Sequence, residues 1–219
     1  MPLLIFDLDG TLIDSRLDLA HSVNAARGFL GLPPLEHPTV YKYVGNGAAV
    51  LIQRALGDLN TPENAANALA FFLDYYSAHK LDYTVLYPGV RQALDRLLAA
   101  RIPMAVLTNK PVRISCAIVE ELGLAGHFFK VYGGNSFEFK KPHRVGIDSL
   151  VDEAGVSREE TIMVGDSGVD IETAHNAGVR SCGVTYGFQP ETFAKWPPDI
   201  LVNRLEELAD QVLLRNHEN

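Results

Sequence analysis

The chain has 219 residues, a formal net charge of −8 and a pI near 5.3. Its length lies between one standard domain and two, and its composition, 47% hydrophobic and 21% charged, excludes a disordered or fibrous protein. The acidic balance argues against nucleic acid or an anionic membrane as the main partner, because both demand a basic face, but it permits a small anionic ligand. No apolar run approaches the roughly 18 residues of a membrane span, and Cys116 and Cys182 suggest no disulfide framework, so we expect a cytoplasmic protein.

Short apolar runs recur along the chain and are typical of parallel strands covered on both faces. Segments with a helical period of apolar residues separate most of these runs. This alternation predicts βαβ crossovers and an open, doubly wound parallel sheet of the α/β class. The predicted strands are 3–6, 104–107, 131–132, 162–164 and 181–184, and the predicted helices follow the stripes at 90–98, 114–122 and 147–154.

The segment between the first strand and Val90 is too long for a loop and contains no convincing strand. Ser15 and Asp18 have the spacing of a capping box at the start of a first helix. A second helix is expected from about Gly47 to Leu56, and a third begins where Thr61-Pro62 supplies an N-cap and a first-turn proline. We therefore predict an all-helical domain at 15–82, inserted into a core formed by 1–14 and 83–219.

Polar side chains follow the predicted strands, at the sheet edge where ligands bind in open α/β folds. Four aspartates at this edge would raise one another's pKa unless a cation lay between them, and an all-oxygen ligand set suits Mg²⁺. Lysine and threonine are groups that hold phosphoryl oxygens. The pattern predicts phosphoryl transfer with an aspartate as nucleophile and a second as general acid and base. The side chains are Asp7 and Asp9, then Thr108, Asn109 and Lys110, then Lys140 and Lys141, and finally Asp166 and Asp170.

These motifs, in this order, resemble the haloacid dehalogenase-like superfamily: Asp7-Leu-Asp-Gly-Thr11, Thr108-Asn109, Lys141-Pro142 and Gly165-Asp-Ser167 with Asp170. The resemblance implies a Rossmann-like core with a helical cap. It also implies that Asp7 forms an aspartyl-phosphate and that Asp9 is the acid and base. Mg²⁺ would be bound by Asp7, by the backbone carbonyl of Asp9 and by Asp166, with Asp170 a ligand or the partner of one. Thr108, Asn109 and Lys141 would hold the phosphoryl group.

The cap segment Tyr43-Val-Gly-Asn-Gly47 looks like that of the phosphoglycolate phosphatase group. Glycines let a backbone approach a ligand closely, so Gly45, Asn46 and Gly47 are candidate substrate-binding residues. Lys42 and Arg54 are weaker candidates for a substrate carboxylate. Other nearby side chains are given structural roles: Phe72 and Tyr76 are expected in the core of the helical bundle, and Lys140 in solvent.

The resemblance predicts a Mg²⁺-dependent phosphatase acting on a small phosphorylated metabolite, with 2-phosphoglycolate as the best candidate and a monomeric or homodimeric enzyme. Asp9 favours a phosphatase or phosphomutase, since dehalogenating members lack an aspartate at this position. A phosphomutase of the β-phosphoglucomutase type is the alternative that shares every core residue. Outside enzymes, the alternatives are a phosphate-accepting signalling protein and a silent binding protein.

Overall fold

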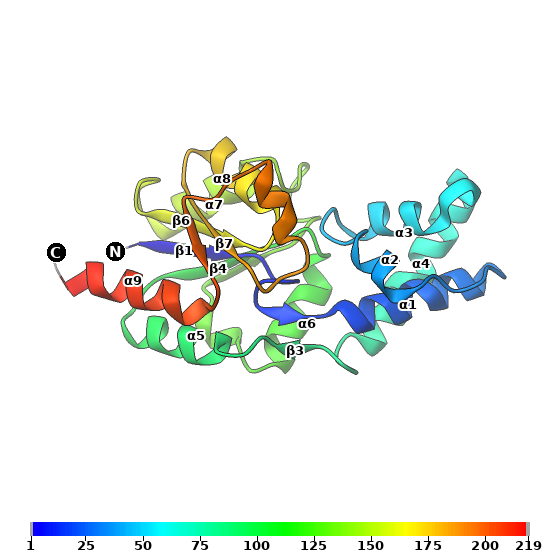
Figure 1. Cartoon of the computed structure of the whole chain (residues 1–219), viewed down its shortest axis with the longest axis horizontal. Helices are drawn as coiled ribbons and strands as arrows, with labels where there is room; N and C mark the ends of the chain where they lie inside the picture. Colours follow the sequence, from blue (N-terminus) through cyan, green and yellow to red (C-terminus); the bar gives the residue numbers. More distant parts are fainter. Residues whose placement is uncertain (1, 218–219) are drawn as a thin grey trace.

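The computed structural model describes residues 2–217, and for 216 and 217 only the backbone. Its centre is a parallel sheet of six strands in the order β5-β4-β1-β6-β7-β8 (Figure 1). The predicted α/β class and doubly wound parallel sheet are confirmed, whereas β8 is not predicted by the sequence patterns above. The strands are β1 (Leu3–Phe6), β4 (Met104–Leu107), β5 (Lys130–Tyr132), β6 (Thr161–Gly165), β7 (Arg180–Val184) and β8 (Ile200–Val202).

Both faces of the sheet are covered by helices, which explains the uninterrupted apolar strands. Successive strand side chains point to opposite faces, so Leu4 and Phe6 pack in one buried cluster and Leu3 and Ile5 in another. The first cluster includes α5 (Val90–Ala99), α6 (Val112–Glu121) and α9 (Leu205–His217), and the second includes α7 (Val145–Ala154) and α8 (Gly168–Ala177). Figure 1 shows α5 and α9 on one side of the sheet and α7 and α8 on the other. Helix α9 is a further element that the patterns do not predict.

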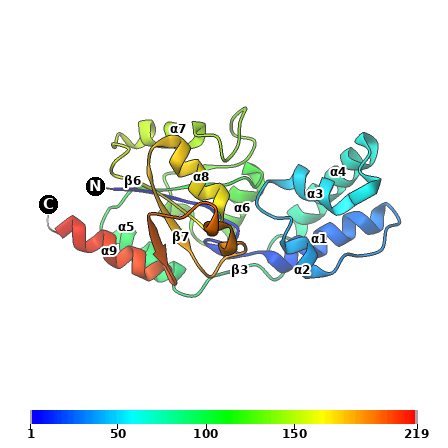
Figure 2. The same ribbon diagram turned by 45° about the horizontal axis from the view of Figure 1, so that its top comes forward.

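A group of helices lies beyond the carboxyl ends of the strands (Figures 1 and 2). These are α1 (Arg16–Phe29), α2 (His37–Tyr41), α3 (Ala48–Leu56) and α4 (Pro62–His79). Three of them begin next to their predicted starts, and the Thr61 hydroxyl accepts a hydrogen bond from the Asn64 amide, as expected of an N-cap. Short 3₁₀ turns occupy Gly57–Leu59, Ala125–His127 and Pro190–Ala194. The division into a core and an inserted domain at 15–82 stays a prediction.

The two chain segments that lead into and out of these helices pair with each other. Strands β2 (Ile13–Asp14) and β3 (Val85–Leu86) form a small antiparallel sheet, which no pattern in the sequence predicts. Buried Asp18 accepts hydrogen bonds from the Tyr83 amide (3.0 Å), the Thr84 amide (2.8 Å) and the Thr84 hydroxyl (2.7 Å). Asp18 therefore fastens the returning chain to α1.

The predicted capping box at the start of α1 is wrong. Ser15 occupies the N-cap position, but its side chain makes no capping hydrogen bond and donates to Asp9 Oδ1 instead. Asp18 faces the returning chain, as described above. The Ser15 and Asp18 side chains therefore make hydrogen bonds to other segments of the chain instead of to the backbone of the first turn of α1. No helix within residues 2–217 has the length and apolar character needed to cross a bilayer.

Candidate active site

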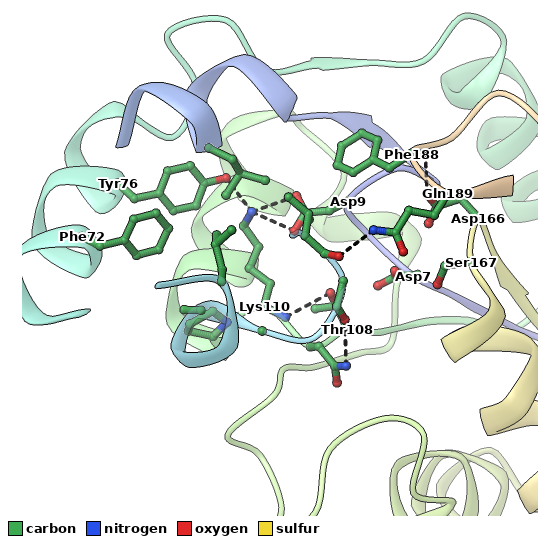
Figure 3. Close-up of a pocket in the computed structure, with 18 residues that line it drawn as sticks. Asp7, Asp9, Phe72, Tyr76, Thr108, Lys110, Asp166, Ser167, Phe188 and Gln189 are labelled. Carbon is green, nitrogen blue, oxygen red and sulfur yellow. Dashed lines mark hydrogen bonds and ion pairs between the residues drawn. The ribbon is translucent and has the colours of Figure 1, made fainter. Parts of the chain in front are cut away.

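The predicted site residues of the core come together at the carboxyl edge of the sheet, facing the helical group. A cavity lies between them (Figure 3). Its core wall includes Asp7, Asp9, Thr108, Asn109, Lys110, Asp166, Ser167, Phe188 and Gln189, and its opposite wall is formed by Leu19, Val44, Gly45, Gly47, Ala48, Leu51, Phe72 and Tyr76. One wall is therefore rich in charged and polar groups and the other is mostly apolar. The charged wall holds three carboxylates and one ammonium, so a small anionic ligand there would need a cation beside the carboxylates.

Three buried aspartates form the most acidic part of the site. Asp7, Asp166 and Asp170 each place a carboxylate oxygen within 4.8 Å of the others. The Lys141 ammonium lies between two of them, 2.9 Å from Asp7 Oδ1 and 2.6 Å from Asp170 Oδ1. The other Asp170 oxygen accepts from the Ser167 amide and hydroxyl at the start of α8. Both Asp170 oxygens thus already bind protein groups, and one of those groups is the site lysine.

Burial and mutual repulsion disfavour the ionised state of these carboxyls. Burial raises the pKa of Asp7 to about 6, an effect that Lys141 opposes and the charge of Asp170 reinforces. The pKa of Asp166 lies well above its usual range, through burial and the charges of Asp170 and Asp7. Burial alone would lower the pKa of Lys141, but the two aspartates beside it raise it instead. Lys141 thus offsets only part of the negative charge of the three carboxylates. A hard divalent cation, which prefers oxygen ligands, would neutralise the rest.

The Asp166 carboxylate is positioned by close packing against two loops. The Phe188 amide donates to its Oδ2 atom at 2.6 Å. A Cβ atom at Gly10 or at Gly187 would overlap with the Asp166 side chain, and Gly10 also has a left-handed φ of 83°. The sequence motif marks Gly10 and Asp166, but it does not show that the 187–188 segment packs against them.

Lys110 is a site residue to which the sequence analysis gave no role. Its ammonium lies 2.8 and 3.0 Å from the two Asp9 oxygens and 2.5 Å from the Tyr76 hydroxyl of α4 (Figure 3). Burial alone would lower the pKa of Lys110, but the charge of Asp9 outweighs it and the pKa is raised. Asp9 also accepts from the Ser15 hydroxyl. Tyr76, the other partner of Lys110, is distant in sequence, so no local pattern could have revealed the contact between Lys110 and Tyr76.

Two aromatic side chains of α4 belong both to the apolar core and to the cavity wall. Phe72 and Tyr76 are buried in the apolar core, as expected, yet both also line the cavity. Burial raises the pKa of Tyr76 to about 12, so its hydroxyl stays protonated. The expectation that these residues belong only to the bundle core was therefore incomplete.

The cap residues proposed as substrate contacts divide into two sets. Gly45 and Gly47 line the cavity. Within the described part of the chain, Asn46, Lys42 and Arg54 are not among the cavity-lining residues. The Asn46 carbonyl accepts a hydrogen bond from Lys140 and the Tyr43 carbonyl one from Arg54. Exposed Lys140, expected in solvent, thus contacts the cap.

The phosphoryl-binding candidates also differ from one another. Thr108 lines the cavity and its hydroxyl oxygen accepts from the Lys110 amide, which leaves the hydroxyl hydrogen available for a ligand. The Asn109 side-chain nitrogen donates to the carbonyls of Gly45 (3.0 Å) and Lys141 (3.1 Å). Since an amide group has only two such hydrogens, Asn109 uses both to position protein segments.

Comparison with known proteins agrees with this geometry. A family model described as haloacid dehalogenase-like hydrolase matches residues 4–184, and the chain belongs to this family. Its similar proteins include the phosphoglycolate phosphatases of Chromobacterium violaceum, 38% identical over 96% of this chain and 95% of the relative, and of Vibrio parahaemolyticus, 41% identical over 96% and 95%. A crystal structure described as a predicted phosphoglycolate phosphatase from Haemophilus somnus has a TM-score of 0.92 and 33% identity, covering 97% of this chain and 98% of that one. Within the family, the chain is a phosphatase.

Proposed function

We propose that the protein hydrolyses a small phosphate monoester, with 2-phosphoglycolate as its best substrate, through a phosphorylated Asp7 intermediate. The observation that carries this proposal is the convergence of Asp7, Asp166 and Lys141 below a cavity whose other wall is formed by the cap helices. The matching relatives named phosphoglycolate phosphatase support the same substrate.

The reaction needs a nucleophile and a proton donor. An Asp7 carboxylate oxygen attacks phosphorus, and the bond from phosphorus to the substrate oxygen breaks as that oxygen takes a proton from Asp9. Asp9 then removes a proton from a water that attacks the phosphorus of the aspartyl-phosphate, which releases inorganic phosphate and restores Asp7. Lys141 and the Thr108 hydroxyl hold the phosphoryl oxygens.

A Mg²⁺ ion fits the carboxylate cluster. We propose Asp7, Asp166 and the backbone carbonyl of Asp9 as its ligands, with Asp170 beside them. When bound, it would neutralise charge on the carboxylates and on the phosphoryl group. Asp170, whose oxygens bind Lys141 and Ser167, orients the lysine whether or not it also contacts the ion.

The apolar wall of the cavity suits a small substrate. The centre of a water molecule can occupy about 50 Å³ of this space, which is compatible with a two-carbon phosphate. We further propose that the substrate carboxylate lies near the start of α3, where Gly47 and Ala48 line the wall, because the first amides of a helix attract anions.

Phosphate release from a panel of small phosphoesters, with Mg²⁺ and with EDTA, tests this function. We expect Mg²⁺-dependent release that is fastest from 2-phosphoglycolate. Asp7→Asn should abolish turnover while circular dichroism stays unchanged, and Asp152→Asn, an exposed position on α7, is the matched control. Conversion of a hexose 1-phosphate to its 6-phosphate would instead indicate a mutase, and sustained turnover in Asp7→Asn would disprove the mechanism. The cytoplasmic location and the monomeric or homodimeric state stay predictions.

A further inference from the structure

Three consecutive backbone carbonyls of the cap are hydrogen-bonded to side chains of the core. Val44 O accepts from Gln189 Nε2 at 2.8 Å, Gly45 O from Asn109 Nδ2 at 3.0 Å, and Asn46 O from Lys140 Nζ at 2.6 Å. The three donors lie on three loops, which follow β7, β4 and β5. Segment 44–46 is thus bound at every carbonyl. We call these three hydrogen bonds the carbonyl latch.

The backbone of this segment is shaped for close approach to the core. Gly45 and Gly47 have left-handed φ values of 111° and 84°, which residues with a Cβ rarely adopt. A Cβ atom at Gly47 would lie 3.0 Å from the Asn109 carbonyl oxygen and 3.2 Å from Lys140 Nζ. The glycines that the sequence suggested for contact with a ligand therefore also allow the cap to meet the core loops.

Each latch donor is the chain neighbour of a residue that builds the phosphoryl site. Asn109 follows Thr108, and Lys140 precedes Lys141, whose ammonium contacts Asp7. Gln189 follows Phe188, whose amide binds the Asp166 carboxylate (Figure 3). The position of the cap segment is consequently tied to the same three loops that position the nucleophile, the phosphoryl-binding groups and Asp166.

We propose that Gln189 and Lys140, together with Asn109, are positioning residues that fix segment 44–47 against the core and thereby limit the enzyme to small phosphoesters. Segment 44–47 includes cavity-lining residues, so releasing it enlarges the space above the phosphoryl site. This proposal rests on the phosphatase function proposed above. Lys140 lies outside the cavity wall, whereas Gln189 is part of it, so Lys140→Met changes the latch without changing the wall.

The test compares a small and a bulky substrate in variants that remove one donor. Gln189→Ala and Lys140→Met should each raise the KM for 2-phosphoglycolate, by about five-fold for the half-buried Gln189 contact and less for exposed Lys140, as expected for single hydrogen bonds. In Lys140→Met the kcat/KM for p-nitrophenyl phosphate should stay constant or rise. The double variant should lower the ratio of kcat/KM for 2-phosphoglycolate to kcat/KM for p-nitrophenyl phosphate by about ten-fold. Lys140→Arg, which keeps a donor, should restore much of the selectivity. Inhibition by inorganic phosphate should be unchanged.

Matched controls are Gln211→Ala and Lys195→Met, at exposed positions outside the cavity wall. Equal losses of kcat/KM for both substrates would mean a general structural role and would overturn the proposal. An unchanged kcat/KM for both substrates would overturn it as well. Hydrogen–deuterium exchange gives an independent readout: amides of peptides covering 43–51 should exchange faster in the Gln189→Ala/Lys140→Met protein than in the controls. If the unaltered protein hydrolysed no phosphoester, the proposed function would fail, and unchanged exchange at 43–51 would then separately reject the latch.

Discussion

Replacing Asp18 with asparagine should lower the free energy of unfolding by about 2–4 kcal/mol, because hydrogen bonds to a charged group contribute about 1.5–3 kcal/mol each and an unpaired buried donor costs about 1–3 kcal/mol. The carboxylate is 2% exposed and accepts from the Tyr83 amide, the Thr84 amide and the Thr84 hydroxyl. All three donors reach Oδ2, so an asparagine oxygen there would still accept from them but without the negative charge. The NH₂ group in the Oδ1 position would face the Tyr83 amide, which lies 3.1 Å from Oδ1.

Urea unfolding followed by far-UV circular dichroism, with linear extrapolation to water, measures this change. Thr84→Val removes one donor and should cost less, about 1 kcal/mol. Asp74→Asn, at an exposed position on α4, should stay within about 0.5 kcal/mol of the unaltered protein. If Asp18→Asn lowered the free energy of unfolding by less than about 1 kcal/mol, the size of an ordinary helix-capping effect, Asp18 would not be the anchor of the returning chain.

Three further substitutions test the less obvious parts of the site. Lys110→Met should reduce kcat for 2-phosphoglycolate more than about ten-fold, since it leaves Asp9 without its ion pair. Tyr76→Phe keeps that ion pair and should reduce kcat only a few-fold. Equal reductions in kcat for the two variants would contradict this ranking. Gly187→Ala should weaken Mg²⁺ activation, because its methyl group would overlap with the Asp166 side chain. An unchanged Mg²⁺ dependence of kcat would show that Asp166 tolerates displacement.

Much of the fold was readable from local sequence because its signals depend on neighbouring residues. Strand β1 is a continuous apolar run since both faces are covered. The Thr61-Pro62 pair marks the start of α4 because the Thr61 hydroxyl accepts a hydrogen bond from the nearby Asn64 amide. Strand β8 and helix α9 carry weaker signals. In β8, Leu201 is exposed beside buried Val202, so this strand lacks the uninterrupted apolar pattern of a central one.

The candidate site was partly predictable for a topological reason. Parallel strands end at one edge of a sheet, so residues that follow β1, β4 and β6 must converge. The order of the strands and the residues that follow them therefore predict that Asp7, Thr108 and Asp166 lie together. These residue types also indicate Mg²⁺ chemistry, since oxygen ligands without His or Cys select a hard cation.

The choice of partner for each polar side chain was decided only in the tertiary structure. Ser15 has the local spacing of a cap but binds Asp9, and Lys110 meets Tyr76 across 34 residues of chain. The carbonyl latch likewise joins cap and core segments far apart in sequence. Such contacts have no periodicity, because they depend on how two groups of elements pack and not on the repeat of a helix or strand. The sequence by itself predicted the parallel sheet apart from β8, three of the four helices beyond it and the polar residues at the strand ends, while packing decided how segment 44–46 is fastened above them.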